Sequence, residues 1–367
     1  MIRVVHVMGR MAPGGTEHQL VGMLKAAHGR YWEATLCVLS GGWEMTKTVA
    51  GAGIRIVELN GSTKFDLRRA NRFRHLAWEA DVVHASLWGA SAFARVVNVG
   101  PGRPALVVSE RGVEDHRHPV LNMINRTLKP VTDGYIGNSR AVVEFIRATH
   151  GIEQSDPRVV AIPNGLDPQV FHPMHQSDPD PQRRPKLVGV GRLVPSKRFD
   201  FAISVLAQLY KQMDVELAIA GDGTERSRLE SLAYGLPVTF LGHVSDRHSL
   251  ANLLQRSDVL VMPSASEGYP NAVLEALACG LRVVASDIPG IREAAGVGVR
   301  LVDDSIDSWI AAIVEALDEP PVAGPQITDR ILSFDEVAQR HLNVFESAIV
   351  RRKRIRDRIP AERNVAS

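Results

Sequence analysis

Two carboxylates, Glu267 and Glu275, stand eight positions apart in the stretch SEGYPNAVLEALACG, residues 266–280. Gly268 and Pro270 prevent one helix from running through both acids, because proline is tolerated only in the first turn of a helix. We therefore expect Glu267 in a loop at the end of a strand and Glu275 just over one turn inside the following helix. Such a carboxylate pair could act on a bond directly, or could position a ligand while another group reacts.

The start of this expected helix is a candidate anion site. The amides that it leaves free belong to Asn271, Ala272 and Val273. Free amides at a helix N-terminus bind anions, and a carboxylate nearby is suited to accept hydrogen bonds from the hydroxyl groups of the same ligand. The alternative interpretation of Glu275 is an acidic side chain favoured only by the helix dipole.

Two cations follow the first expected strand of the second half of the chain. In LVGVGRLVPSKRFD, Arg192 and Lys197 are five residues apart and precede a helix. An arginine fork and a lysine point charge at the end of one strand suit a diphosphate. A solvated loop edge is the simpler alternative for each cation by itself.

Glycine-rich turns occur in both halves. AIAGDGTERSRLESL places Gly221 in a turn before a helix, but lacks the full spacing of a dinucleotide-binding fingerprint. Near the N-terminus, MAPGGTEHQL places Gly14 and Gly15 after the first strand and Glu17 in the helix that follows. These glycines would let the backbone approach a ligand closely, and a tight structural turn explains them equally well.

The elements that must position these residues alternate between strands and amphipathic helices. We expect strands at residues 3–8, 34–39, 54–59, 81–84, 105–109 and 134–137, and again at 186–190, 216–220, 238–241, 259–262, 282–285 and 300–301. Alternation of this kind predicts parallel sheets covered by helices on both faces. The proline-rich stretch 162–185 lacks periodicity and separates two doubly wound α/β domains, which we place at residues 1–171 and 172–345 with a helix at about 346–367 packing back on the first.

Composition excludes several classes of protein. Aromatic residues make up 5% of the 367 residues and the formal net charge is +2, which argues against a nucleic-acid binder. Cys37 and Cys279 stand in apolar runs without disulfide or metal-ligand spacing. No signal peptide and no apolar run of about 20 residues is present. The sequence therefore predicts a cytoplasmic protein.

The ordered combination of these motifs resembles a known family. GG-x-E, R-x4-K, GDG, E-x7-E and SDIPG occur in this order, together with DVVHASLWG, IPNGLDPQVFHP and FLGHVSD. This set is similar to the retaining glycosyltransferases of family four, and the similarity runs over nearly the whole chain. It implies the GT-B fold, two Rossmann-like domains facing across a deep cleft.

The resemblance implies a nucleotide-diphosphate sugar as co-substrate, bound mainly by the second domain, with no cofactor or metal. Arg192 and Lys197 would neutralise the diphosphate, Glu267 would bind sugar hydroxyls, and Glu275 would bind the ribose. The implied donor-binding residues are Gly14, Gly15, Arg192, Lys197, Gly221, His243, Val244, Glu267, Gly268, Tyr269, Pro270, Asn271, Ala272, Val273 and Glu275. The backbone around His243 would hold the base, for which uridine is favoured. In the front-face mechanism of such enzymes the leaving phosphate oxygen takes the acceptor proton, so the carboxylate pair would position the donor and would not hydrolyse a bond.

The first domain would bind a hydroxyl acceptor, which is a saccharide, a lipid-linked molecule or a small molecule. Here the sequence departs from the family, which often carries two histidines two apart where this chain has His84 and Ser86. The family also often carries a histidine near the reacting sugar, in a segment like VVSERG, where this chain has Arg111. Either the alignment shifts by one residue or Arg111 replaces the imidazole, and His116 or His118 could serve instead. We count Arg111 with Glu267, Arg192 and Lys197 as a candidate catalytic residue. The candidate acceptor-binding residues are Glu17, His84, Glu110, Arg111, His116 and His118.

The acceptor domain also contains a basic amphipathic helix at residues 64–80. A solvated helix face is the simpler interpretation, and the basic face leaves open a peripheral contact with the inner face of a membrane.

Other functions stay open from sequence alone. A GT-B epimerase or phosphorylase would keep the fold and change the reaction. A nicotinamide-dependent oxidoreductase is disfavoured, because no G-x-G-x-x-G follows either first strand. A non-catalytic sugar-binding relative would retain the same donor residues.

Overall fold

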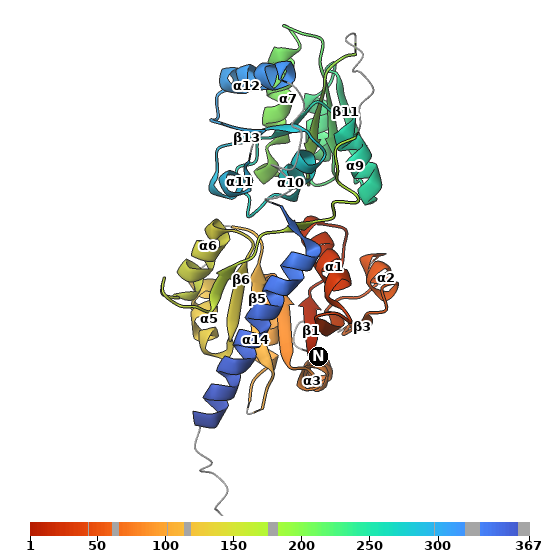
Figure 1. Cartoon of the computed structure of the whole chain (residues 1–367). Helices are drawn as coiled ribbons and strands as arrows, with labels where there is room; N and C mark the ends of the chain where they lie inside the picture. Colours follow the sequence, from red (N-terminus) through yellow and green to blue (C-terminus); the bar gives the residue numbers. More distant parts are fainter. Residues whose placement is uncertain are drawn as a thin grey trace, which may run out of the picture. The chain divides into compact units, whose positions relative to one another are not determined.

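The computed structural model describes residues 1–42, 44–60, 66–100, 102–113, 119–174, 183–296, 298–319 and 331–358. The chain divides into two compact units (Figure 1). Unit 1 contains residues 1–165 and 334–367, and unit 2 contains residues 166–333. The sequence had placed the boundaries after residues 171 and 345, whereas the chain leaves unit 1 at Gly165 and re-enters it at Phe334.

Unit 1 is built on a seven-stranded sheet in the order β3-β2-β1-β4-β5-β6-β7. Its strands run parallel and are β1 (Ile2–Met8), β2 (Trp32–Val38), β3 (Arg55–Glu58), β4 (Val82–Ser86), β5 (Ala105–Glu110), β6 (Gly134–Gly137) and β7 (Val159–Ala161). The connecting helices are α1 (Gly15–Ala27), α2 (Glu44–Ala50), α3 (Leu67–Trp78), α4 (Trp88–Val97), α5 (Pro119–Thr127) and α6 (Arg140–His150), with the short helix η1 (Lys129–Val131). The helix expected at residues 64–80 is thus α3, which begins after the capping residue Asp66.

Unit 2 is built on a six-stranded sheet in the order β11-β10-β9-β12-β13-β14. Its parallel strands are β9 (Lys186–Val190), β10 (Glu216–Ala220), β11 (Val238–Gly242), β12 (Val259–Met262), β13 (Arg282–Ser286) and β14 (Val299–Val302). The helices are η2 (Pro195–Lys197), α7 (Phe199–Leu209), α8 (Arg226–Leu232), α9 (Arg247–Gln255), α10 (Asn271–Ala278), α11 (Pro289–Ala294) and α12 (Ile306–Asp318). Two short strands, β8 (Gly165–Leu166) and β15 (Leu332–Ser333), form a separate pair where the chain passes between the units.

The predicted fold class, two doubly wound α/β domains, is confirmed by these two parallel sheets. Central strands such as β4 and β12 are buried along their whole length, which explains why they are short apolar runs, whereas the edge strands β3, β11 and β14 are partly exposed. In unit 2, the core on one face gathers around α9 and α10, and the core on the other around α7 and α12. Strand β7 had no counterpart in the sequence prediction.

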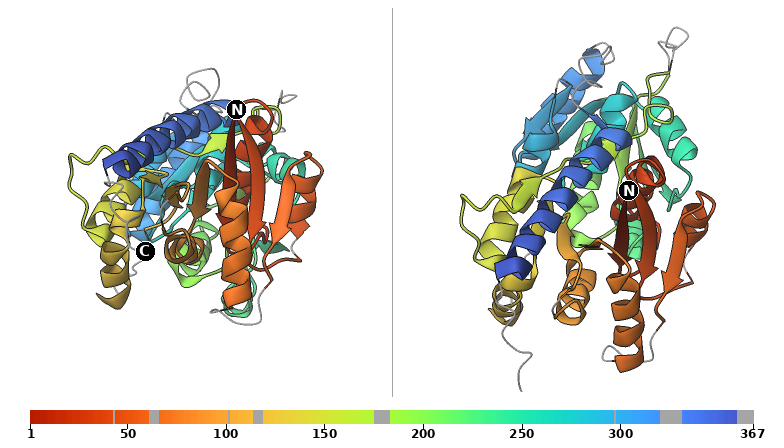
Figure 2. Two further views of the ribbon diagram at one scale, coloured as in Figure 1. Left: turned by 90° about the horizontal axis from the view of Figure 1, so that it is seen from below. Right: turned by 60° about the horizontal axis from the view of Figure 1, so that its bottom comes forward.

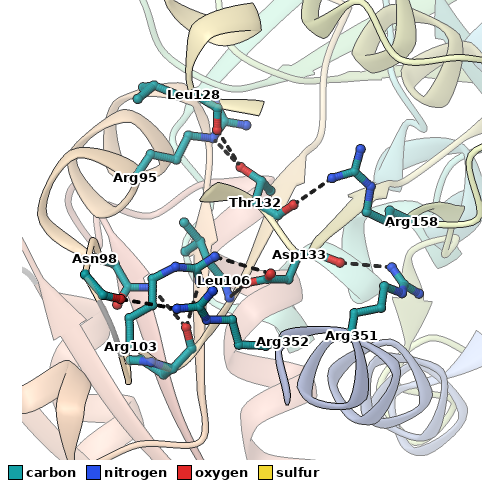
Figure 3. A network of polar contacts seen from close by, with 12 residues as sticks. Arg95, Asn98, Arg103, Leu106, Leu128, Thr132, Asp133, Arg158, Arg351 and Arg352 are labelled. Carbon is teal, nitrogen blue, oxygen red and sulfur yellow. Dashed lines mark hydrogen bonds and ion pairs between the residues drawn. The ribbon is translucent and has the colours of Figure 1, made fainter. Parts of the chain in front are cut away.

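Helix α14 (Phe334–Arg358) returns to unit 1 and packs against α1 and β5, as the views in Figure 2 show. At its far end, Arg351 Nη1 donates to the backbone oxygen of Asp133 over 2.9 Å (Figure 3). The Asp133 carboxylate is buried and forms an ion pair with Arg103, at 2.7 Å from Oδ2 to Nη1. Arg352 Nη2 donates to the backbone oxygen of Gly100 over 3.2 Å. These contacts fasten the end of α14 to the loops that precede β5 and β6.

Candidate functional site

In unit 2 the strand order reverses between β9 and β12, which lie side by side at the centre of the sheet. Ligands of such sheets bind outside the carboxyl ends of the strands at this point, because the connections leave in opposite directions. The loops after the two strands are joined by a backbone hydrogen bond of 2.8 Å from Ala265 N to Ser196 O. The candidate cations and the first carboxylate come from these two loops.

The contact between the loops includes an ion pair. Lys197 Nζ donates to Glu267 Oε1, and the two side chains are 17% and 10% exposed. Lys197 has three donor hydrogens, so it retains donors for a further anion. Arg192, by contrast, is exposed, and its guanidinium makes no ion pair or hydrogen bond with a residue that the structure describes. This edge of unit 2 therefore offers a positive charge that no described residue neutralises.

Glycines allow the loops of this edge to pack closely. Gly221 has φ of +158°, and a Cβ there would lie 1.8 Å from the oxygen of Gly191. A Cβ at Gly290, the glycine of SDIPG, would lie 2.1 Å from the backbone oxygen of Glu267. Side chains at these positions would push the β9 and β12 loops away from their neighbours. The glycines thus hold the backbone that carries Arg192 and Glu267.

Helix α10 begins at Asn271 with Pro270 as its N-cap, so the proline stands just outside the helix and not within its first turn. Gly268 and Pro270 are buried, while Tyr269 is partly buried and packs against the core. Burial, reinforced by the negative charge of Glu293, raises the pKa of the Tyr269 phenol, which keeps it a neutral hydrogen-bond donor.

Glu275 lies in α10 and its side chain is only 3% exposed. Its Oε1 accepts a hydrogen bond of 2.5 Å from Nη2 of Arg247, the first residue of α9. The sequence analysis did not identify Arg247, since nothing in the local pattern links it to an acid 28 positions later. Close to α9, His243 is exposed and Val244 packs against the core, and Gly242 O accepts from Gly221 N over 2.8 Å.

Unit 1 brings several of its candidates to the carboxyl edge of its own sheet. Gly14 caps α1 in an extended conformation, and a Cβ there would lie 2.6 Å from Glu17 Oε2. Gly15 is exposed as the first residue of the helix. Glu17 also attracts Arg111, which follows Glu110 at the end of β5. These residues therefore lie around the ends of β1 and β5.

Arg111 is held by two buried asparagines. Its Nη1 donates to Asn164 Oδ1 over 2.8 Å, and its backbone oxygen accepts from Asn138 Nδ2 over 3.2 Å. Burial lowers the pKa of the Arg111 guanidinium to about 10, with Glu17 opposing the shift, so the side chain stays charged at neutral pH. The sequence analysis missed both asparagines, although Asn164 lies in the quoted segment IPNGLDPQVFHP.

His84 is fully buried, contrary to what contact with an acceptor requires. The Trp32 indole can only donate, so its bond of 3.1 Å makes His6 Nε2 an acceptor. Neutral His6 then donates from Nδ1 to His84 Nδ1 over 2.9 Å, and His84 Nε2 donates to Ser109 Oγ over 2.7 Å. Both ring nitrogens of His84 are occupied, so we remove it from the residues available to a ligand.

Burial explains the protonation state of this histidine cluster, which we define as His6, His84 and His341. His341 lies on α14, with its ring centroid 5.6 Å from that of His84. Burial lowers the pKa of His6 to about 3, of His341 to about 4, and of His84 well below its usual value, and the charge of Arg111 adds to the shift of the last two. All three imidazoles are therefore neutral at physiological pH.

Leu87, directly after β4, has φ of 69° and ψ of 156°, a region that favours glycine, and its amide donates to Ser109 O over 2.9 Å.

The candidates His116 and His118 lie outside the described residues. Within the described ranges, no three histidine, cysteine or acidic side chains gather as metal ligands. No helix there is long and apolar enough to cross a bilayer.

Comparisons with known proteins agree with this geometry. Residues 13–170 match the profile described as Glycosyltransferase Family 4, and residues 184–319 match the one described as Glycosyl transferases group 1. The chain belongs to the family-four glycosyltransferases. The expected family is thereby confirmed.

Two mycobacterial proteins match parts of this chain. A Mycobacterium tuberculosis protein named GDP-mannose-dependent alpha-(1-6)-phosphatidylinositol dimannoside mannosyltransferase is 40% identical over 36% of this chain and 37% of its own length. The glycogen synthase of the same organism is 30% identical over 67% of this chain and 62% of its own length. The matches thus span less than two thirds of these relatives.

Solved structures extend the likeness in fold to nearly the whole chain. Anabaena HepE, solved in complex with UDP and glucose, superimposes with a TM-score of 0.78 at 18% identity, over 95% of this chain and all of that one. Sucrose-phosphate synthase from Thermosynechococcus elongatus superimposes with a TM-score of 0.68 at 16% identity, over 98% and 99% of the two chains. Both comparisons support the GT-B fold.

Proposed function

We propose that this protein is a retaining glycosyltransferase that moves a hexosyl group from a nucleotide-diphosphate sugar to a hydroxyl acceptor. The observation that carries the proposal is the position of Arg192, Lys197 and Glu267 in the loops after β9 and β12, where the strand order of unit 2 reverses. Family membership supports a sugar donor at this edge.

The difficult step of such a transfer is the departure of the diphosphate from the anomeric carbon. Fixed positive charge stabilises the leaving group as its negative charge grows. In our proposal Arg192 and Lys197 contact the diphosphate, and the positive end of the α10 dipole adds to their charge. Because Lys197 also binds Glu267, one cation would link the leaving group to the carboxylate that orients the sugar.

Bond making would occur on the same face as bond breaking. The carbon–oxygen bond to the diphosphate breaks, the acceptor oxygen bonds to the anomeric carbon, and the released phosphate oxygen takes the acceptor proton. We further propose that Glu275 binds the ribose, that the backbone at His243 and Val244 holds the base, and that no cofactor or metal is needed. Acceptor contacts are proposed for unit 1, with Arg111 and Glu110 as the first residues to test.

A thermal unfolding screen tests donor binding. UDP, GDP and their sugars are each added with and without EDTA, and NADH and inorganic phosphate serve as the comparison ligands. A ligand that binds the folded state at about 100 times its Kd stabilises by about 2.7 kcal/mol. We expect UDP and UDP-sugars to raise the midpoint regardless of EDTA; the GDP arm is included because GDP-mannose appears in the name of the mycobacterial relative.

Three results would count against parts of this proposal. Stabilisation by NADH or phosphate, with none by any nucleotide sugar, would reject the transferase function. Donor turnover that does not depend on adding a hydroxyl acceptor would favour an epimerase. Loss of binding on adding EDTA would reject the metal-independent mechanism.

A further inference from the structure

Arg247, the first residue of α9, has a well-defined position in unit 2 but no role in the proposed mechanism. The Asp246 carboxylate caps α9 by accepting from Ser249 N over 2.7 Å, which sets Arg247 at the first helical position. The Arg247 guanidinium carbon lies 4.6 Å from the centre of the Phe171 ring, and Phe171 is buried. Packing on this ring restricts where the guanidinium can point.

Arg247 is the counter-ion of a buried acid. The Glu275 side chain is 3% exposed, and a carboxylate at that depth requires a paired charge or hydrogen bonds. Oε1 accepts from Arg247 Nη2 over 2.5 Å. Among the described residues, no group donates to Oε2. The acid is therefore fixed through one oxygen, and its second oxygen retains acceptor capacity.

A second buried acid shows what a purely structural pair looks like in this protein. Asp133 is also buried, but both of its oxygens are occupied: Arg103 donates to both oxygens, and Leu106 N donates to Oδ2 over 2.8 Å. Glu275 differs because half of its carboxylate has no donor in the described structure. The second oxygen of Glu275 is thus able to accept a hydrogen bond from a ligand.

We propose that Arg247 is a positioning residue of the donor site: by binding one oxygen of Glu275, it presents the other to a ribose hydroxyl of the nucleotide. This inference rests on the proposed function, which assigns the ribose to Glu275. The arrangement parallels that of Lys197 and Glu267, in which a cation from a separate element binds Oε1 of the other acid in the pair.

The test measures recognition of ribose hydroxyls directly. Dissociation constants of UDP and GDP, and of their 2′,3′-dideoxy analogues, are compared between the wild type and Arg247→Met. We expect the wild type to bind the parent nucleotide about tenfold or more tightly than the dideoxy analogue, since a hydrogen bond to a charged group is lost. In Arg247→Met that ratio should approach one, and the donor KM should rise more than kcat falls.

Controls separate positioning from general stability. Arg300→Met removes an arginine of similar exposure, 23% against 29%, that pairs with Glu315 and Glu319 in the same unit, and it should keep the wild-type ratio. Arg247→Lys retains the charge without the planar fork, and should restore part of the discrimination. This variant also serves if Arg247→Met does not fold.

The outcomes distinguish a failure of the proposed function from a failure of the positioning role of Arg247. If neither nucleotide binds the wild type, the proposed function and the role of Arg247 both fail. If the wild type discriminates against the dideoxy analogue and Arg247→Met or Arg247→Lys does so equally well, only the positioning role is wrong. A lower unfolding midpoint with an unchanged ratio would likewise overturn it, because a merely structural contact gives that result.

Discussion

In unit 1 the two central strands, β1 and β4, place His6 opposite His84 in a fully buried position. The corresponding strands of unit 2, β9 and β12, pair apolar residues there, Leu187 with Val259 and Val188 with Leu260. The strand order is the same in both sheets apart from one additional edge strand in unit 1. The two sheets therefore share one topology, but only unit 1 pairs polar side chains between its two central strands.

The difference separates stability from ligand binding. In unit 1 the histidine cluster is buried between the sheet and α14, where its hydrogen bonds can serve only the fold. In unit 2 the candidate donor-site groups stand at the carboxyl edge, as the pairs Lys197–Glu267 and Arg247–Glu275 and the unpaired Arg192 within the described residues. Charge changes at this edge of unit 2 should therefore alter activity, and protonation of the histidine cluster in unit 1 should alter stability.

The largest expected effect comes from Arg192→Ala in unit 2. Because a fixed donor to a developing negative charge is lost, turnover should fall about 10²–10³-fold. The free energy of unfolding should change by less than about 0.5 kcal/mol, since the exposed side chain has no bond to a described residue. Steady-state kinetics and urea unfolding measure the two quantities.

The control for Arg192→Ala is Lys186→Ala. Lys186 is the first residue of β9, whereas Arg192 follows the other end of that strand. Lys186 pairs with Glu216, with 3.8 Å between Nζ and Oε1. Its removal should leave turnover near the wild-type value. Equal losses of turnover in both variants would mean that the carboxyl edge of unit 2 has no special role.

The second effect is acid destabilisation of unit 1. Folding lowers the pKa of His6 to about 3 and of His341 to about 4, so below pH 6.5 the unfolded chain binds protons that the folded unit does not. Stability is complete above that pH and declines as the pH falls toward 4, by about 2 kcal/mol per buried histidine at pH 5.

Hydrogen exchange, corrected for intrinsic rates, can follow β1 and β4 separately from β9 and β12 at pH 7 and pH 5. We expect the protection of unit 1 amides to fall more than that of unit 2 amides. Equal losses in the two units would contradict the assignment of neutral histidines to the core of unit 1.

The smallest expected effect comes from the contact between α14 and the loop that precedes β6. Arg351→Ala removes the hydrogen bond to the Asp133 backbone and should lower the free energy of unfolding by about 1–2 kcal/mol. Arg356→Ala, on the same helix but exposed and paired with its neighbour Asp357, should change it by less than about 0.5 kcal/mol. Thermal or urea unfolding compares them, and equal values would show that the contact in Figure 3 adds no stability.

Much of the fold could be predicted because its signals are local. Strands β6, β9, β10 and β12 have the bounds that the apolar runs indicated, since a strand buried on both faces reads as a continuous apolar segment. Strand β7 was missed because three residues are too few to establish such a pattern. The position of Glu275 within α10 followed from Gly268 and Pro270 in the same way.

The sequence predicted which residues form the candidate site, but it did not predict the contacts between them. Lys197 and Glu267 were both candidates, but their ion pair joins residues 70 positions apart and exists because β9 and β12 are neighbours in the sheet. Arg247 was missed for the same reason. His84 was placed at the acceptor, whereas the cover provided by α14 buries it, and a histidine in an apolar strand does not reveal which helix will pack over it.

The sequence by itself determined the two α/β domains, the family and the set of charged residues at strand ends, because each depends on short-range periodicity or on ordered motifs. Only the tertiary structure decided which of these residues meet. Strand order and register bring distant loops together, and burial then determines whether an ionisable side chain remains available to a ligand or becomes part of the core.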